Sequence, residues 1–264
     1  ASGQRLDVYP RFTHSFGSDI AVTQRLGLRE TAYSLTHTDE FESSPHREGL
    51  DYNITANARL FKKYGTFTHI VEPSLGYTFA SASGSDLPLF DSTELYSRTS
   101  RIDLSVLNRF MDENGEFLTL RITQPFDALN EDRPFMPMKF EAALKKPVYL
   151  RGDLSFNVHT GEIEGLNSDI AFSIKNASFS AGERYNRSED ILFYSFGISY
   201  MLSRALSAEG NLWYDAKDGG LKDMIAKIKY KQQCWGATMV FTKRQDEFSI
   251  SVLFDLLGLG SLSI

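Results

Sequence analysis

Apolar and polar residues alternate along most of the chain, which is the pattern of β-strands whose two faces meet different surroundings. Between residues 192 and 200 every second position is apolar or aromatic, while most positions between them are small or polar. The apolar positions of this segment are Leu192, Tyr194, Phe196, Ile198 and Tyr200. Similar segments occupy residues 206–214, 224–230, 235–241 and 248–254. The pattern predicts an all-β chain.

The length of these segments and the charges on their polar side distinguish a membrane barrel from a soluble sandwich. Strands of soluble sandwiches have about 5 or 6 residues, whereas the alternation here continues for about ten, as in transmembrane barrels. The polar positions include full charges, among them Arg151, Asp153, Lys227 and Lys229. A water-filled interior tolerates such charges, and lipid accepts the apolar face. We therefore predict a transmembrane antiparallel β-barrel.

The connections between the segments alternate between short and long in the first half of the chain. Long polar connections are expected at 34–47, 81–93 and 126–137, and tight ones at 16–19, 62–65, 111–115, 145–147, 175–176, 202–204 and 232–233. Bacterial barrels place short turns in the periplasm and long loops outside the cell. This rule predicts a periplasmic C-terminus.

Counting strands between these connections gives about 15, an odd number, whereas single-chain bacterial barrels have even numbers. We therefore expect residues 1–264 to be one segment, the C-terminal portion of a larger barrel. A miscount by one strand is the alternative, and it would favour an outer-membrane porin or a substrate-selective diffusion channel. An adhesion barrel is disfavoured because the later outer loops are short.

Composition excludes several other classes. No run of about 18 apolar residues could cross a bilayer as a helix. The 42% hydrophobic residues, with 20 Phe and 12 Tyr, exclude a disordered chain. The net charge of −6 and the lack of a basic stripe argue against a nucleic-acid partner. Cys234 is the one cysteine, so neither an internal disulfide nor a cysteine zinc site can form.

Several segments resemble the C-terminal half of the LptD family, the lipopolysaccharide-assembly proteins of Gram-negative outer membranes. These segments are Arg5 to Phe12 (RLDVYPRF), His69 to Phe79 (HIVEPSLGYTF), Leu87 to Ser92 (LPLFDS) and Phe254 to Ser261 (FDLLGLGS), together with Cys234 and Trp235. They occur at both ends and in the middle of the chain. The resemblance implies an integral protein of the outer membrane that inserts lipopolysaccharide into the outer leaflet through its lumen and a lateral gate.

In the last strand, the resemblance assigns one side of the gate to Phe248, Ile250, Val252 and Phe254. It also implies partners for the protein. These are lipopolysaccharide, an LptE-like plug lipoprotein, LptA-like periplasmic bridge proteins that act through an upstream domain, and the outer-membrane assembly machinery. No cofactor and no covalent chemistry are expected.

Cys234 departs from the family pattern. The family commonly has two adjacent cysteines before the Trp and uses them for disulfides to its periplasmic domain, but Gln233 occupies the first place here. The resemblance therefore implies at most one intermolecular or interdomain disulfide from this segment. The expected topology places Cys234 just after a periplasmic turn, within reach of such a partner. An inert thiol is the alternative reading.

Other candidate chemistry is weak. Ser155 and His159 share a strand face but lie four residues apart without a supporting acid, so no catalytic residues are expected. An acidic loop could attract a divalent cation, but its spacing matches no ligand motif, and we expect no metal site. Its residues are His37, Asp39, Glu40, Glu42, His46 and Glu48. Pro10 and Pro73 would each remove a ladder hydrogen bond, and they are expected at bulges or edges.

Overall fold

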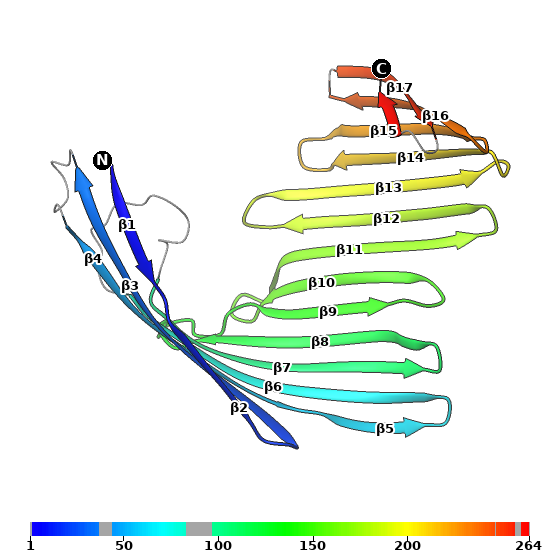
Figure 1. Cartoon of the computed structure of the whole chain (residues 1–264). Coiled ribbons are helices and arrows are strands. Elements are labelled where there is room, and N and C mark those ends of the chain that lie inside the picture. Colours follow the sequence, from blue (N-terminus) through cyan, green and yellow to red (C-terminus); the bar gives the residue numbers. More distant parts are fainter. Residues whose placement is uncertain (1, 37–43, 83–96, 246, 257–259, 264) are drawn as a thin grey trace. The chain divides into compact units, whose positions relative to one another are not determined.

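The computed structural model describes residues 2–36, 44–82, 97–245, 247–256 and 260–263, which form antiparallel strands joined by turns (Figure 1). Within these ranges, no helix has the length and hydrophobicity that crossing a membrane requires. The described strands number 18. They are β1 (Ser2–Val8), β2 (Arg11–Phe16), β3 (Ile20–Thr36), β4 (His46–Ala58), β5 (Leu60–Tyr64), β6 (Phe67–Ala82), β7 (Thr99–Asp112), β8 (Gly115–Asp127), β9 (Met138–Leu144), β10 (Tyr149–Asn157), β11 (Glu162–Ile174), β12 (Ala177–Asn186), β13 (Ile191–Met201), β14 (Leu206–Asp215), β15 (Gly220–Lys231), β16 (Trp235–Arg244), β17 (Glu247–Leu256) and β18 (Gly260–Ser263).

The chain divides into two compact units. The first contains Ala1–Asn108 with Arg121–Met138, and the second contains Arg109–Leu120 with Lys139–Ile264. In the first unit, β3 pairs with β1 and β2 on one side and with β4 on the other, and β6 pairs with β4 and β5. In the second unit, each strand from β10 to β17 pairs with the next along the chain. The single-domain assignment of residues 1–264 stays a prediction.

The structure has 18 described strands where the sequence predicts about 15. Two of the three additional strands arise because a proline interrupts a predicted strand or its neighbour. Val8 opposes Glu30 and Arg11 opposes Gly27, so β1 and β2 keep one register along β3 and are interrupted only at Pro10. The Pro10 carbonyl still accepts a hydrogen bond of 3.1 Å from the Leu28 amide. Proline has no N–H to complete the ladder, so a single predicted strand appears as two.

Pro73 has the same effect on its neighbour. On β6, Ser74 opposes Asn57 of β4 and Val71 opposes Leu60 of β5, again in one register. The break between β4 and β5 falls opposite Glu72 and Pro73, so this proline produces neither an edge nor a bulge. The third additional strand, β18, is a short return of the chain along β17.

The turns lie where the sequence predicts them. Gly115, with φ of 106°, begins β8 after the turn at 113–114, and Gly65, with φ of 52°, lies in the turn between β5 and β6. A backbone with φ near 106° is disfavoured for residues with a Cβ, so glycine is required at position 115.

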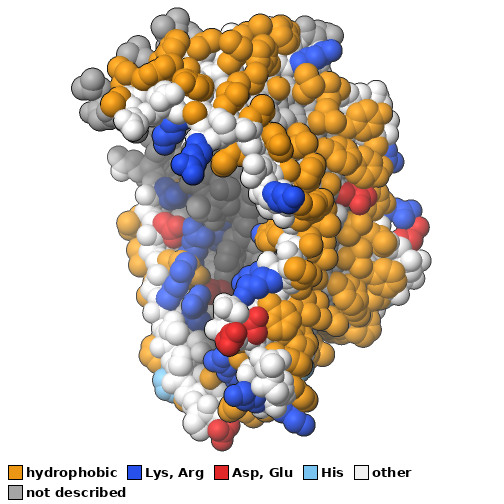
Figure 2. Space-filling model, turned by 90° about the vertical axis from the view of Figure 1, so that its right-hand side faces the viewer, with side chains coloured by type: hydrophobic (Ala, Val, Ile, Leu, Met, Phe, Trp, Pro, Cys, Tyr) orange, Lys and Arg blue, Asp and Glu red, His pale blue; other side chains and the backbone are white. Residues whose placement is uncertain are grey.

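The predicted alternation of the two faces is confirmed in β13. Phe196, Ile198 and Tyr200 are about half exposed on one face of β13, whereas Ser195, Gly197 and Ser199 lie on the other. Figure 2 shows hydrophobic side chains over broad areas of the surface in view, with few charges among them. Exposed apolar areas of this extent mark a surface that contacts lipid or another partner.

We expect a lysine at position 198 to destabilise the protein in a bilayer far more than a lysine at position 199. Ile198→Lys would place a charge on the lipid face, at a cost that rises from about 1 kcal/mol near the membrane interface to about 2–4 kcal/mol at the bilayer midplane. Ser199→Lys is the matched control, since Ser199 lies on the polar face directly opposite Glu209. Urea unfolding in phospholipid bilayers measures both variants. Equal losses of stability would contradict the assignment of faces.

Candidate functional site

The predicted gate strand is β17, and its four named residues lie on one face. Phe248, Ile250 and Phe254 are 63%, 56% and 43% exposed, and Val252 is partly buried. All ten residues of β17 pair with β16, from Arg244↔Glu247 to Trp235↔Leu256. On its other side, β18 pairs with only four residues, Leu253 to Leu256. The structure thus confirms the strand, and its role as a gate stays a prediction.

Cys234 is exposed, with its thiol free, in the turn between β15 and β16. This turn is closed by a hydrogen bond of 2.8 Å from the Gln232 amide to the Trp235 carbonyl, and the Trp235 ring lies 5.5 Å from that of Tyr230. The thiol is therefore accessible to a partner. The disulfide itself stays a prediction.

Ion pairs cross the polar face of the second unit between neighbouring strands. Arg184 donates to both carboxylate oxygens of Asp169 at 2.7 and 2.9 Å, and also to the carbonyls of Ser168 and Glu183. Lys229 contacts Glu209 at 2.6 Å. A third ion pair, Arg244 with Asp223 at 3.1 Å, joins β16 to β15. Alternating charge lets this face hold many ions without large net repulsion.

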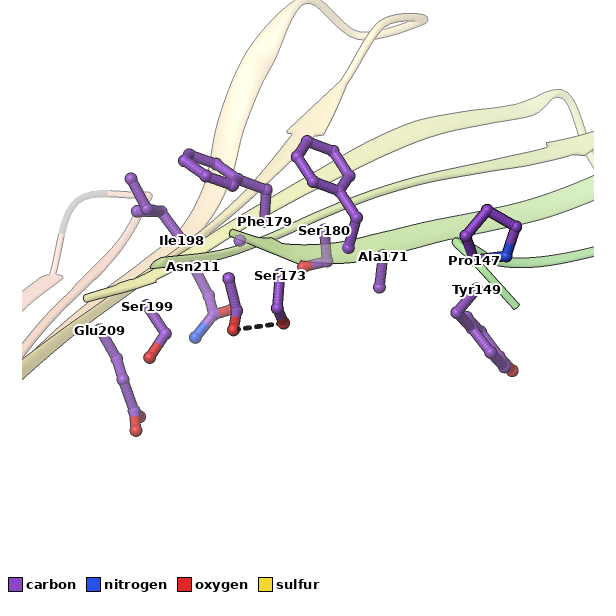
Figure 3. Close-up of a pocket in the computed structure, with 13 residues that line it drawn as sticks. Pro147, Tyr149, Ala171, Ser173, Phe179, Ser180, Ile198, Ser199, Glu209 and Asn211 are labelled. Carbon is purple, nitrogen blue, oxygen red and sulfur yellow. Dashed lines mark hydrogen bonds between the residues drawn. The ribbon is translucent and has the colours of Figure 1, made fainter. Parts of the chain in front are cut away.

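A depression of about 530 Å³ lies on the polar face between β11 and β14, toward the short turns. Nearly half of its lining consists of small residues, namely Ala171, Ser173, Ser178, Ser180, Gly197 and Ser199. In Figure 3, Ser199, Glu209 and Asn211 point to one side of the sheet, and Phe179 and Ile198 to the other. The Ser173 and Ser178 hydroxyls are 2.8 Å apart.

Gly197 leaves room in this depression for the side chains of Ser180 and Asn211. A Cβ at position 197 would lie 2.3 Å from the Ser180 hydroxyl oxygen and 2.9 Å from the Asn211 amide oxygen. The depression was not predicted from the sequence, although small residues at alternate positions of β11, β12 and β13 are its signal. A sheet surface covered with small side chains leaves room for a passing solute.

A second depression, of about 920 Å³, lies toward the other ends of β9 to β12 and is lined by charges of both signs. Its charged residues are Lys139, Glu141, Asp153, Glu164 and Arg187. Asp153 accepts a hydrogen bond of 2.8 Å from Asn167, and Glu164 accepts one of 2.6 Å from Asn157. The lining is largely polar, as predicted for this face of the sheet.

The turns at this end of the sheet are tied together by charge. Asp215 accepts hydrogen bonds from the amides of Lys217 and Asp218 at 2.9 and 3.1 Å, which fixes the turn after β14. Lys217 reaches Asp190 of the preceding turn at 2.6 Å. The hydrogen bond to the Asp190 carboxylate raises the pKa of the Lys217 ammonium above its usual value.

The remaining candidate residues form no recognisable centre. His159 lies in the turn after β10, where its backbone amide donates to Asn157. Residues 37–43 of the acidic loop and the LPLFDS segment lie outside the described residues, as do residues 257–259 of the last motif. In the part of the chain that the structure describes, no three His, Cys, Asp or Glu side chains gather as metal ligands would.

A single-layered antiparallel sheet with an apolar, exposed face and a charged opposite face is the wall of an outer-membrane β-barrel. The family described as "LptD: LPS transport system D" matches residues 1–236. The chain belongs to the LptD family. The matched region includes the RLDVYPRF and HIVEPSLGYTF segments and Cys234, and it ends before β17. At the level of the family, the function is lipopolysaccharide transport at the outer membrane.

Similarity to solved structures is remote. A triple mutant of the Rhodopseudomonas blastica porin is 9% identical over 99% of this chain and 93% of that chain, with a TM-score of 0.42. The copper transporter OprC is 12% identical over 96% of this chain and 56% of that chain, with a TM-score of 0.38. Neither similarity bears on function. No curated protein matches the chain.

We expect Arg184→Ala to lower the free energy of unfolding by about 1 kcal/mol, which is the upper end of the range for an exposed ion pair. The loss is this large because the Arg184 side chain donates to both Asp169 oxygens and to two backbone carbonyls. Arg187→Ala, which removes an ion pair with Glu162 in the adjoining turn, is the matched control and should cost less. Denaturant unfolding in micelles compares the two. A larger loss for Arg187→Ala would contradict the importance assigned to the Arg184 pair.

Proposed function

We propose that this chain forms part of the wall of a barrel that inserts lipopolysaccharide into the outer leaflet, passing its saccharide along the polar face and releasing its acyl chains through a lateral gate. The family match over residues 1–236 is the observation that carries this proposal. The two unlike faces of the sheet support it, because an amphipathic substrate needs a polar path for its sugars and an exit toward lipid for its chains.

In this proposal β17 is one side of the gate. Its ladder with β16 has ten residue pairs, whereas its opposite edge pairs with β18 at four residues near the C-terminal end. Strands part at a cost that grows with the number of ladder hydrogen bonds. The portion of β17 from Glu247 to Val252 is therefore available for a weak, reversible pairing with the first strand of the barrel.

Cys234 is proposed to form a disulfide with a periplasmic partner or domain, since its thiol is exposed in a short turn. This assignment requires that the short turns, and with them the C-terminus, face the periplasm. An LptE-like plug, LptA-like bridge proteins acting through an upstream domain, and the outer-membrane assembly machinery complete the set of proposed partners.

A porin or diffusion channel is the less well supported alternative. A porin would share the alternating faces, but the family match to a lipopolysaccharide transport protein favours transport of an amphipathic lipid.

We expect that tethering Ile250→Cys to a cysteine in the first strand of the native barrel stops lipopolysaccharide export, because the seam can then no longer part. The experiment uses the full protein with Cys234→Ser and a short bifunctional maleimide. The control joins Val240→Cys to Ser251→Cys, which face each other on β16 and β17 and are expected to stay paired during transport. Surface lipopolysaccharide is measured in both. Undiminished export through the tethered seam would disprove the gate.

We also expect the mobility of the native polypeptide, extracted from outer membranes with free thiols blocked, to change on reduction. In the Cys234→Ser variant, we expect the mobility to change less on reduction than in the unaltered protein, because the disulfide from Cys234 is missing. Complete alkylation of Cys234 before reduction would show that its thiol is free and would refute the disulfide while leaving the transport proposal intact.

A further inference from the structure

Arginines gather on the polar face of β1, β2 and β3, although the chain as a whole is acidic. Arg5, Arg11, Arg25 and Arg29 occupy alternate positions of that face, as the registers with β3 show. We call these four residues the arginine cluster. The same face of β1 and β4 carries two carboxylates near them, Asp7 and Asp51. The charges of these two carboxylates decide which arginines remain available to a ligand.

Asp7 is already engaged by Arg29. The Arg29 guanidinium donates to both Asp7 oxygens, from Nε at 3.0 Å and from Nη2 to the second oxygen. Thr31 adds a hydrogen bond to Asp7 at 3.3 Å. This pair is structural, since it holds β1 to β3.

Asp51 is engaged by Tyr9, whose hydroxyl donates to it at 2.6 Å. Gly27 lies beneath this contact, and a Cβ there would fall 2.1 Å from an Asp51 oxygen and 2.7 Å from the Tyr9 ring. Glycine at this position therefore leaves room for the Tyr9 ring beside β3. The ring in turn supports Arg11, whose guanidinium carbon is 3.9 Å from the ring centroid, a cation–π distance.

Arg11 and Arg25 have no carboxylate partner among the described residues. Both are exposed. Arg11 lies opposite Gly27, two positions from Arg25, so they are diagonal neighbours of about 7–8 Å, within reach of long side chains. Two adjacent cations without an intervening acid repel each other, and an anion bound between them removes that repulsion.

We infer that Arg11 and Arg25 bind the phosphate groups of lipopolysaccharide as it passes along this face, with Tyr9 holding the Arg11 guanidinium in place. The inference rests on the proposed function and adds to it the group of the substrate that is recognised and the residues that recognise it. Guanidinium groups suit phosphate because their planar donors bind two oxygens at once. Their exposure also permits release, which transport requires.

A binding cycle with the full protein in detergent tests the inference. The probes are the phosphorylated lipid anchor of lipopolysaccharide and its enzymatically dephosphorylated form. We expect the unaltered protein to bind the phosphorylated probe about tenfold more tightly, and Arg11→Gln/Arg25→Gln to lose that preference. The matched control is Lys62→Gln/Lys63→Gln, which removes two positive charges from β5, near its turn, and should keep the preference.

The outcomes separate the two proposals. If the double arginine variant retains the preference for phosphate, the inference is overturned and the proposed function stands. If the unaltered protein binds neither probe, both fail. Inorganic phosphate is titrated in parallel. If it displaces the phosphorylated probe at equal concentration, the site binds free phosphate and the inference is overturned. If it displaces the probe only at large excess, the inference is supported.

Discussion

Backbone hydrogen bonding in lipid is the constraint on which the rest of this structure depends. A strand in a bilayer has no water to satisfy its N–H and C=O groups, so each strand must pair with its neighbours. From β10 to β17 this pairing is continuous in the chain order, with register shifts within two strand pairs, β10–β11 and β14–β15. Because pairing fixes the strands side by side, the residue alternation along each strand becomes an alternation of whole surfaces.

The two surfaces have different physical requirements. The apolar face needs only hydrophobic bulk, so its residues are large and exposed, as Phe196 and Ile198 are. The polar face must hold charges near one another, and it does so by cross-strand pairs such as Arg184 with Asp169. Where the pairing of charges is incomplete, as at Arg11 and Arg25, the face gains affinity for an ion of the opposite sign.

Much of this fold could be predicted from the sequence, because period-two alternation and turn residues are local signals. The tight turns and the face of every residue in β13 and β17 follow from them. The kind of interruption that Pro10 and Pro73 cause in the strand pairing could not be predicted from the sequence. A proline can make a bulge, an edge or a simple gap, and the partner strand decides which.

The candidate site was less accessible to sequence reasoning. The gate residues Phe248 to Phe254 could be assigned to one face, but their function depends on a partner strand that the sequence does not identify. The depression around Gly197 and the contact of Tyr9 with Asp51 arise from residues on different strands, so only their register brings them together. Family membership, which the RLDVYPRF segment suggested, is confirmed by the match over residues 1–236.

The central claim is that lipopolysaccharide travels along the polar face of this sheet. Site-specific photocrosslinking from position 211, in place of Asn211 on that face, tests it directly in living cells. The account predicts lipopolysaccharide adducts that form while lipopolysaccharide is being delivered to the outer membrane and disappear when delivery is stopped. An absence of adducts during active delivery, or adducts that persist unchanged after delivery stops, would contradict it.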